Sequence, residues 1–180
     1  AIFTNLTHDH LDYHKDFDSY FKAKKKLFEM LPPTSFALSN MDDGYGLPMT
    51  EDIKAKVSMY GFGENTEILD FYGRLMGIDF KGLYLDINGE EMHVNLLGKF
   101  NAYNILAVWG ASQLLGFYMV KVENILGDIK PPRGRFEHFT NKNGVTVIVD
   151  YAHTPDALEN VLSTILEIKG ETSRVISVFG

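Results

Sequence analysis

The stretch "VTVIVDYAHTPDALENVL" (residues 145–162) changes from a strand pattern to a helix pattern within a few positions. Its first half is a continuous β-branched run, which is typical of a central strand in a parallel sheet. Thr154 can cap the helix that follows, with Pro155 at the first helical position. "RVISVF" (residues 174–179) then has the composition of another strand. We therefore expect a right-handed βαβ unit, which belongs to an α/β fold.

The segment just before this unit carries Pro131, Pro132 and Gly134 within "KPPRGRFEHF" (residues 130–139). Proline and glycine together commonly mark the linker between two domains. We therefore divide the chain into a first unit, residues 1–132, and the start of a second unit, residues 133–180.

The first unit contains both helix and strand signals. In chain order they are a strand end over 1–6, a helix over 17–31, a buried strand within 35–44, a weak helix over 52–57, β structure over 57–97, a long buried helix over 98–116 and a short helix over 122–126. Asp16 or Asp18 can cap the first helix, and Pro32-Pro33 ends it. Asn88-Gly89, flanked by alternating apolar residues, predicts a β-hairpin.

The composition limits the classes of protein. A net charge of −7 argues against a general nucleic-acid binder, because phosphate contacts need a basic face, although a few local Lys or Arg can hold a small anion. The absence of cysteine excludes disulfides, a thiol nucleophile and a zinc–thiolate site, and it suits the cytoplasm. No apolar run approaches the ~20 residues of a membrane span. Both ends stop inside strand patterns, so we expect a fragment of a longer protein.

Lys24 stands among the apolar residues of the helix predicted over residues 17–31. Those residues recur at spacings of three and four: Phe17, Tyr20, Phe21, Leu27, Phe28 and Leu31. One interpretation is that the long side chain of Lys24 reaches past the apolar rim to water. The other is that its ammonium is desolvated and its pKa lowered, which leaves an amine that can react or ligate. Addition of CO2 to that amine would give an anionic carbamate able to hold Mg2+.

The segment "THDHLDYHKD" (residues 7–16) concentrates three histidines and three aspartates. His10 and His14 are four residues apart, so a helical turn would place them on one face. His8 and Asp12 repeat this spacing. Two interpretations stay open, a metal site and a capped polar turn that faces water.

Asn101 and Asn104 lie three residues apart at the start of the long predicted helix. An amide offers both a donor and an acceptor, which suits the edge of a purine base. In the alternative interpretation, Asn101 caps the helix and Asn104 binds a neighbouring loop.

Arg135 and Asp150 flank the start of the second unit. Arg135 directly follows the linker, where a guanidinium can close onto a phosphate or form an ion pair at the interface. Asp150 ends the predicted strand, and the carboxyl ends of parallel strands are where α/β sheets bind ligands such as ribose. A helix-capping role for Asp150 is the alternative.

Five blocks, in this order, resemble the Mur ligases, the ATP-dependent amide-bond enzymes of bacterial cell-wall synthesis. They are "TNLTHDHLDYH" (4–14), "YFKAKKKLF" (20–28), "GKFNAYNILA" (98–107), "GRFEHF" (134–139) and "VIVDYAHTPDALENVL" (147–162). The last is the most specific and is similar to the MurE type, the UDP-N-acetylmuramoyl-dipeptide amino-acid ligases. The resemblance implies the second half of a central ATPase domain, with a mixed sheet, helices and a β-hairpin extension. The first βαβ unit of a Rossmann-like C-terminal domain would follow it.

The resemblance also implies roles for particular residues. They are Lys24 as the carbamylated lysine, His10 as a partner of Mg2+, Asn101 and Asn104 at the adenine, Asp150 at the ribose, Arg135 near the γ-phosphate and His153 beside the nucleotide. Lys24 and Arg135 would serve catalysis directly. His14 lies in the matching block, but no role is carried over to it.

The implied reaction adds the third amino acid to UDP-MurNAc-L-Ala-D-Glu. ATP would phosphorylate the terminal carboxylate to an acyl phosphate, and the amine of the free amino acid would displace phosphate. The implied cofactors are ATP and Mg2+, and the partners are the UDP-MurNAc-peptide and a free amino acid. A monomeric cytoplasmic protein with no nucleic-acid or membrane partner is expected.

This sequence departs from the family pattern in three places. The phosphate loop of the form G-T-N-G-K-T, the glutamate for the other Mg2+ and the motif that reads the amino acid are all missing. We therefore expect the chain to be inactive alone, and the choice between lysine and diaminopimelate stays open. The alternatives are another superfamily member, such as a folylpolyglutamate or cyanophycin synthetase, and a non-catalytic nucleotide-binding module. "YAHTPDALE" after Asp150 favours the MurE type.

Overall fold

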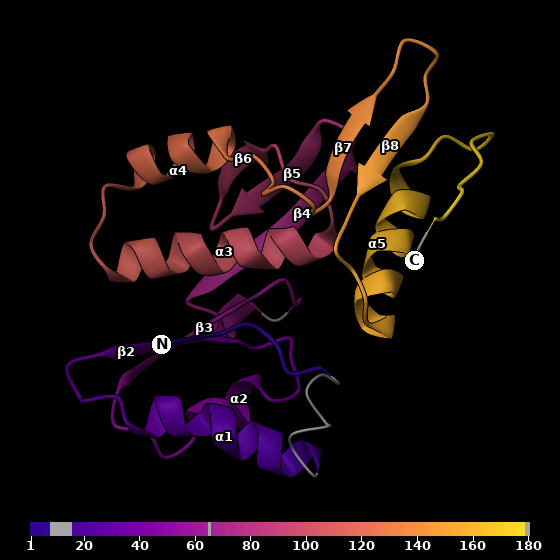
Figure 1. The fold of residues 1–180 in the computed structure, drawn as a ribbon. Coiled ribbons are helices and arrows are strands. Elements are labelled where there is room, and N and C mark those ends of the chain that lie inside the picture. The colour runs from indigo at the N-terminus through magenta and orange to yellow at the C-terminus, as the bar shows by residue number, and fades with distance from the viewer. Residues whose placement is uncertain (8–15, 65, 179–180) are drawn as a thin grey trace.

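The computed structural model describes residues 1–7, 16–64 and 66–178, and it shows an α/β fold (Figure 1). Within these residues the main sheet has six strands in chain order: β1 (Ile2–Phe3), β2 (Phe36–Asn40), β3 (Lys56–Gly61), β4 (Phe71–Asp79), β5 (Gly82–Ile87) and β6 (Glu90–Val94). Strands β1 to β4 pair in parallel, whereas β4 to β6 pair antiparallel. The expected mixed sheet with a hairpin extension is confirmed.

Helices cover both faces of the parallel part of this sheet. The helices α1 (Phe17–Glu29) and α2 (Gly46–Thr50) lie on one face, and α3 (Lys99–Leu114) lies on the other (Figure 1). Successive residues of a strand point to opposite faces. Accordingly, Ala37 belongs to the apolar cluster beneath α1, and its neighbour Leu38 belongs to the cluster beneath α3. The sheet is therefore buried on both sides, as parallel sheets usually are.

The predicted helix near the N-terminus is confirmed as α1. Its N-cap is Asp16, whose carboxylate accepts a hydrogen bond of 2.7 Å from the backbone N–H of Ser19. This hydrogen bond satisfies one of the N–H groups left without a partner at the start of a helix. The helix ends at Glu29, shortly before Pro32 and Pro33, which cannot continue it.

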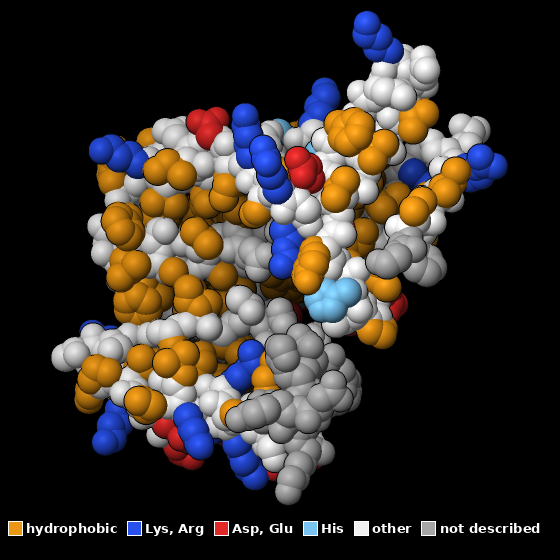
Figure 2. Space-filling model, viewed as in Figure 1, with side chains coloured by type: hydrophobic (Ala, Val, Ile, Leu, Met, Phe, Trp, Pro, Cys, Tyr) orange, Lys and Arg blue, Asp and Glu red, His pale blue; other side chains and the backbone are white. Residues whose placement is uncertain are grey.

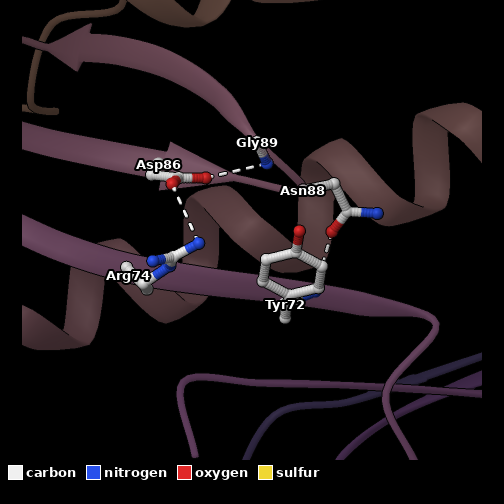
Figure 3. A network of polar contacts seen from close by, with 5 residues as sticks. All are labelled: Tyr72, Arg74, Asp86, Asn88 and Gly89. Carbon is white, nitrogen blue, oxygen red and sulfur yellow. Dashed lines mark hydrogen bonds and ion pairs between the residues drawn. The ribbon is translucent and has the colours of Figure 1, made fainter. Parts of the chain in front are cut away.

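The predicted hairpin joins β5 to β6 through Asn88-Gly89. Both residues have a positive φ, 51° at Asn88 and 91° at Gly89, as a tight two-residue turn requires. Figure 3 shows the Asn88 side chain reaching the start of β4, where its oxygen accepts from the N–H of Tyr72 at 2.8 Å. Asp86 accepts from the N–H of Gly89 at 2.8 Å and pairs with Arg74 at 3.5 Å (Figure 3). These contacts fasten the turn to β4 and fix the register of the hairpin.

The long helix predicted over residues 98–116 is α3, and the short helix is α4 (Met119–Asp128). Much of α3 is buried, including Ala102, Ile105, Leu106 and Trp109. A helix that is apolar nearly all round must be buried on several sides, and α3 packs between the sheet and α4.

The second unit holds β7 (Glu137–Thr140), β8 (Thr146–Val149) and α5 (Pro155–Ile168), and it corrects two expectations. β8 was expected to be a central parallel strand, but it pairs antiparallel with β7 in a separate two-stranded sheet. Residues 174–178 form no strand, so among the described residues the βαβ unit lacks its second strand. A β-branched run predicts an extended backbone, but the partner comes from elsewhere in the fold. Val147 and Val149 remain exposed accordingly.

The weak helix expected over residues 52–57 is also wrong. The helical turn lies earlier, at α2, with Pro48 in its first turn, where proline is tolerated. Asp52 has a φ of 60°, outside the right-handed helical region, and Lys56 already pairs with Phe36 in the sheet. A short 3-10 helix, η1 (Thr66–Ile68), precedes β4. Across the described ranges, no helix is both long enough and apolar enough to cross a bilayer.

Candidate functional site

The carboxyl ends of the parallel strands β1, β2 and β3 lie side by side. The side chain of Asn40, the last residue of β2, links β2 to the segment that follows β1. Asn40, 6% exposed, donates from its amide to the carbonyl of Thr4 at 2.8 Å. Its oxygen accepts from the N–H of Asp42 at 3.1 Å. This edge of a parallel sheet is where α/β proteins place their ligands.

Two aspartates follow Asn40, and each holds a different part of this edge. Asp43 accepts from the backbone N–H of Leu6 at 3.0 Å and of Tyr45 at 2.8 Å. Sequence reasoning missed both residues as candidates. The signal was present in "SNMDD", a polar run directly after a buried strand, where the edge of a sheet is expected.

Asp42 connects this edge to α3. Its Oδ2 atom accepts the hydroxyl of Tyr103 at 2.8 Å and the N–H of Phe62 at 2.6 Å. Burial raises the pKa of Tyr103, and the hydrogen bond to Asp42 and its negative charge raise it further. Burial likewise raises the pKa of Tyr60, whose hydroxyl donates to the carbonyl of Phe3 at 3.2 Å. Both hydroxyls therefore stay protonated and act as donors at neutral pH.

Lys24 is exposed, which contradicts the interpretation that its ammonium is desolvated. The apolar stripe packs through residues such as Phe28, but Leu27, on the same side as Lys24, is itself 57% exposed. The ammonium of Lys24 lies 5.0 Å from the ring centroid of Tyr20. The long side chain reaches water past the apolar rim, as the first of the two interpretations predicted.

Lys24 nevertheless lines an open groove of about 330 Å³ between β1 and α1. The lining residues are Ile2, Phe3, Thr4, Asn5, Ala23, Lys24, Leu27 and Phe28. A lysine ammonium carries donors only and cannot ligate a cation. A carbamate on Lys24 would change that, since it would bring oxygen ligands, which Mg2+ prefers, beside the polar side chains of Thr4 and Asn5. The donor set of the groove thus fits Mg2+ once Lys24 is modified.

His10, the predicted partner of Mg2+, lies outside the described residues, as do His8 and His14. In the parts of the chain that the structure describes, no three His, Asp or Glu side chains gather closely enough to hold a metal ion. The role of His10 stays a prediction.

Asn101 and Asn104 share one side of α3, as their spacing predicts. The amide of Asn104 donates to the side-chain oxygen of Asn101 at 3.2 Å, and the amide of Asn101 donates to the carbonyl of Leu97 at 2.7 Å. Asn101 is not the N-cap, because Gly98 occupies that position with a φ of 91°. Asn104 is exposed, so its amide is accessible to a ligand.

Arg135, Asp150 and His153 come together around Tyr151. The guanidinium of Arg135 lies 5.3 Å from the ring centroid of Tyr151, and the rings of Tyr151 and His153 lie 5.0 Å apart. His153 Nδ1 lies 2.9 Å from the carbonyl oxygen of Tyr151. Sequence reasoning missed Tyr151, although its aromatic ring between two candidate residues was the available signal.

Asp150 is held rigidly at the end of β8. One carboxylate oxygen accepts from the N–H of Phe136 at 2.7 Å, and the other accepts from the N–H of Ala152 at 2.8 Å. Asp150 does not cap α5, because the N-cap is Thr154. Each oxygen keeps accepting capacity, so the carboxylate can also bind hydroxyl groups of a ligand.

The helix that carries the asparagine pair and the segment that carries Arg135 are joined by aromatic packing. The rings of Phe100 and Phe136 lie 6.4 Å apart, and these residues directly adjoin Asn101 and Arg135 in the chain. Two polar contacts add to this junction between residues 1–132 and 133–180. Lys99 and Glu167 form an ion pair of 3.1 Å, and the ring of His138 lies 3.0 Å from the carbonyl oxygen of Phe80.

The surface around these groups is mixed in character. Figure 2 shows Lys and Arg side chains together with hydrophobic, acidic and neutral ones on this face. The helix that carries Lys24, α1, and the helix that carries the asparagine pair, α3, cover opposite faces of the sheet (Figure 1).

Known proteins are similar to this chain along its whole length. The profile of the Mur ligase middle domain matches residues 1–112, and that of the Mur ligase, glutamate ligase domain matches residues 134–180. The UDP-N-acetylmuramoyl-L-alanyl-D-glutamate--2,6-diaminopimelate ligase of Phocaeicola vulgatus is 50% identical over 180 residues, covering 100% of this chain and 37% of the relative. The chain thus spans little more than a third of the length of such curated relatives.

Solved structures agree in fold. A structure of UDP-N-acetylmuramoyl-L-alanyl-D-glutamate--2,6-diaminopimelate ligase has a TM-score of 0.77 and 28% identity, covering 95% of this chain and 36% of that one. MurF from Acinetobacter baumannii has a TM-score of 0.83 at 17% identity, covering 94% of this chain and 38% of that one. The latter likeness concerns the fold alone.

Proposed function

The chain belongs to the Mur ligase family, and on that premise we propose that the full-length protein is an ATP-dependent ligase that adds an amino acid to UDP-MurNAc-L-Ala-D-Glu. The relative from Phocaeicola vulgatus is named for diaminopimelate, so we propose diaminopimelate as the amino acid. The observation that carries the proposal is the junction at Phe100 and Phe136. These two phenylalanines directly precede Asn101 and follow Arg135 in the chain, so their contact supports a nucleotide held between the two units.

In this proposal the nucleotide lies at the junction of residues 1–132 and 133–180. Asn101 and Asn104 bind the edge of the adenine, because their amides share one side of α3 and Asn104 is accessible. Asp150 accepts the ribose hydroxyls with a carboxylate that two backbone N–H groups already orient. The domain boundary itself is supported by the two family profiles, which stop at residue 112 and resume at residue 134.

Arg135 and His153 complete the nucleotide site in this proposal. The guanidinium of Arg135 is exposed and held against the ring of Tyr151, so it can reach the γ-phosphate without first leaving a buried ion pair. The ring of His153 lies 5.0 Å from the same Tyr151 ring, and in this proposal it stands beside the nucleotide. A permanently charged guanidinium aimed at the transferred phosphoryl group stabilises the charge that develops there.

We also propose that Lys24 is carbamylated and helps to hold Mg2+ together with His10. The open groove beside Lys24 leaves room for the modification, in which the ε-ammonium loses a proton and the resulting amine adds CO2. When bound, Mg2+ would neutralise phosphate charge. The carbamate formed from Lys24 and CO2 would supply the oxygen ligands, and the lysine side chain would hold them at the wall of the groove beside Thr4.

The proposed chemistry has two steps. The γ-phosphoryl group of ATP passes to the terminal carboxylate of the UDP-MurNAc-peptide, which gives an acyl phosphate and ADP. The amine of the amino acid then attacks the acyl carbon, and inorganic phosphate leaves. The residues of this chain serve mainly to bind and orient ATP, which is the larger part of phosphoryl-transfer catalysis. We expect a monomer in the cytoplasm, where ATP and the UDP-linked substrate occur.

The test is phosphate release by the full-length product of the gene. With ATP, Mg2+ and UDP-MurNAc-L-Ala-D-Glu, we expect release only when diaminopimelate is added, and a product heavier by one diaminopimelate residue. Lysine in its place measures the specificity. ATP binding without any product from either amino acid would instead indicate a non-catalytic nucleotide-binding module.

A further inference from the structure

One carboxylate oxygen, Asp42 Oδ2, receives hydrogen bonds from two elements that are distant in sequence. The hydroxyl of Tyr103 in α3 donates to it at 2.8 Å, and the N–H of Phe62, just after β3, donates to it at 2.6 Å. Asp42 itself lies just after β2. The three elements are therefore tied together at the carboxyl edge of the sheet by a single side chain.

The backbone around Asp42 leaves space for this carboxylate. A Cβ atom added at Gly61 would lie 2.8 Å from Asp42 Oδ1, and one added at Gly63 would lie 2.9 Å from it. Any side chain at either glycine would displace the carboxylate. Phe62, between the two glycines, also packs its ring 4.8 Å from that of Tyr103. The chain after β3 thus forms a cradle that holds Asp42 in front of α3.

Further hydrogen bonds connect Asp42 to the segment that follows β1. The side chain of Asn40 accepts from the N–H of Asp42 at 3.1 Å and donates to the carbonyl of Thr4 at 2.8 Å. Asn40 is almost fully buried, so the backbone that carries Asp42 is fixed relative to β1 and β2. In the contact between Asp42 and Tyr103, Asp42 is therefore the residue whose position is fixed by the sheet.

Tyr103 lies between Asn101 and Asn104 in sequence but on another side of the helix. Each residue turns an α-helix by about 100°, so Tyr103 is about 200° from Asn101 and about 100° from Asn104. Tyr103 faces the sheet edge, where it meets Asp42, and Asn104 is exposed. Together with the buried face of α3, the contact of Tyr103 with Asp42 therefore helps to set the rotation of the helix about its axis, and with it the direction of both amides.

We propose that Asp42 and Tyr103 are positioning residues for the adenine base, acting through the rotation of α3. This inference rests on the proposed function, in which Asn101 and Asn104 bind the adenine edge. Neither Asp42 nor Tyr103 touches the base in this proposal. Hydrogen bonds to a base edge depend strongly on direction, so a small rotation weakens adenine recognition while leaving the phosphate end of the nucleotide in place.

The test compares ATP and GTP as substrates of the full-length protein and of its Tyr103→Phe variant. This change removes the hydroxyl and keeps the ring that packs on Phe62. We expect the KM for ATP to rise about tenfold with kcat within about twofold, because uniform binding is lost and the chemical step is not. The preference for ATP over GTP, measured as the ratio of kcat/KM values, should fall by a similar factor.

Three further variants separate positioning from a general loss of stability. Asp42→Asn retains an oxygen that can accept both hydrogen bonds, so it should keep most of the ATP preference, whereas Asp42→Ala should behave as Tyr103→Phe does. Ser112→Ala is the matched control, since it removes a hydroxyl hydrogen bond of 2.8 Å from the other end of the same helix. It should leave both KM and nucleotide preference unchanged.

The possible outcomes are distinct. If the wild-type protein shows no ATP-dependent ligation, the proposed function fails. If the wild type is active and Tyr103→Phe lowers the melting temperature without changing the ATP preference, the hydrogen bond is merely structural and the inference is overturned. The inference is supported if the preference for ATP over GTP falls in Tyr103→Phe and Asp42→Ala but is largely kept in Asp42→Asn.

Discussion

Phe100 and Phe136 pack with their ring centroids 6.4 Å apart, although 36 positions separate them in the chain. Phe100 is in the first turn of α3, and Phe136 lies directly before β7. Phe136 is 1% exposed and has a φ of 49°, an uncommon conformation for a bulky residue. Its N–H also donates to Asp150 at 2.7 Å. Phe136 therefore contributes both to the packing between the two units and to the orientation of Asp150, the residue that we predict to bind the ribose.

The first prediction concerns this contact. Phe136→Ala should lower the free energy of unfolding by about 3–5 kcal/mol, because it removes a fully buried aromatic side chain. Chemical denaturation followed by circular dichroism measures the change. Phe139→Ala is the control, since Phe139 is on the same segment but exposed, and it should change stability by less than about 0.5 kcal/mol. Equal losses in the two variants would contradict the packing described here.

The second prediction concerns Lys24. Lys24→Ala in the full-length protein should reduce ligase activity by about 100-fold or more, because it removes the proposed carbamate from the phosphoryl-transfer site. Stability should stay within about 0.5 kcal/mol, since Lys24 is exposed. Small carboxylates such as acetate should partly restore activity by replacing the lost oxygen ligands.

Lys26→Ala is the control for that experiment, since Lys26 is an exposed lysine on the same helix. It should retain full activity. If Lys24→Ala were as active as Lys26→Ala without added carboxylate, Lys24 would have no role in the reaction.

The third prediction concerns pH and the N-cap of α1. The hydrogen bond from the backbone of Ser19 is the main cause that holds the pKa of Asp16 below its usual 3.8. A carboxyl whose pKa is lower in the folded state stabilises the fold above its unfolded pKa, and this stabilisation is lost as the pH falls through the folded pKa. Asp16→Asn can still cap the helix but does not titrate there. The stability advantage of the wild type should therefore shrink below about pH 3.8 and vanish in stronger acid, as measured by urea unfolding. A pH-independent difference would contradict this cause.

The fourth prediction concerns the hairpin turn. Asn88→Ala should destabilise the protein by about 1–3 kcal/mol, because it loses the hydrogen bonds to Tyr72 and Asp70 and places alanine at a positive φ. Asn88→Gly relieves the conformational strain but still lacks the side chain, so its loss should be smaller. Thermal unfolding compares the two variants. Equal stability of Asn88→Ala and the wild type would show that the side-chain contacts contribute nothing.

Local features of the fold could be predicted from the sequence. The capping Asp16, the apolar spacing and Pro32-Pro33 together indicated α1, and Asn88-Gly89 indicated the hairpin. Each of these signals acts over a few residues, so neighbours in the sequence contain the needed information.

Pairings between distant segments could not be predicted in this way. The β-branched run that became β8 indicated an extended strand, but its antiparallel partner β7 depends on how the segment after the linker folds back. The contact of Asp42 with Tyr103 joins residues 61 positions apart, and no periodicity connects them. Spacing placed Lys24 on the apolar stripe of α1, but Lys24 and Leu27 are exposed while Phe28 is buried, and the spacing does not show which part of the stripe the sheet covers.

The central claim is that one nucleotide is bound by residues of both units. The most direct test is the equilibrium affinity of the full-length protein for a non-hydrolysable ATP analogue, in a double-mutant cycle of Asn104→Ala and Asp150→Ala. Each single variant should bind the analogue about tenfold more weakly. The double variant should bind more weakly than either single variant, because the adenine and the ribose belong to one ligand. Unchanged affinity in both single variants would contradict the claim.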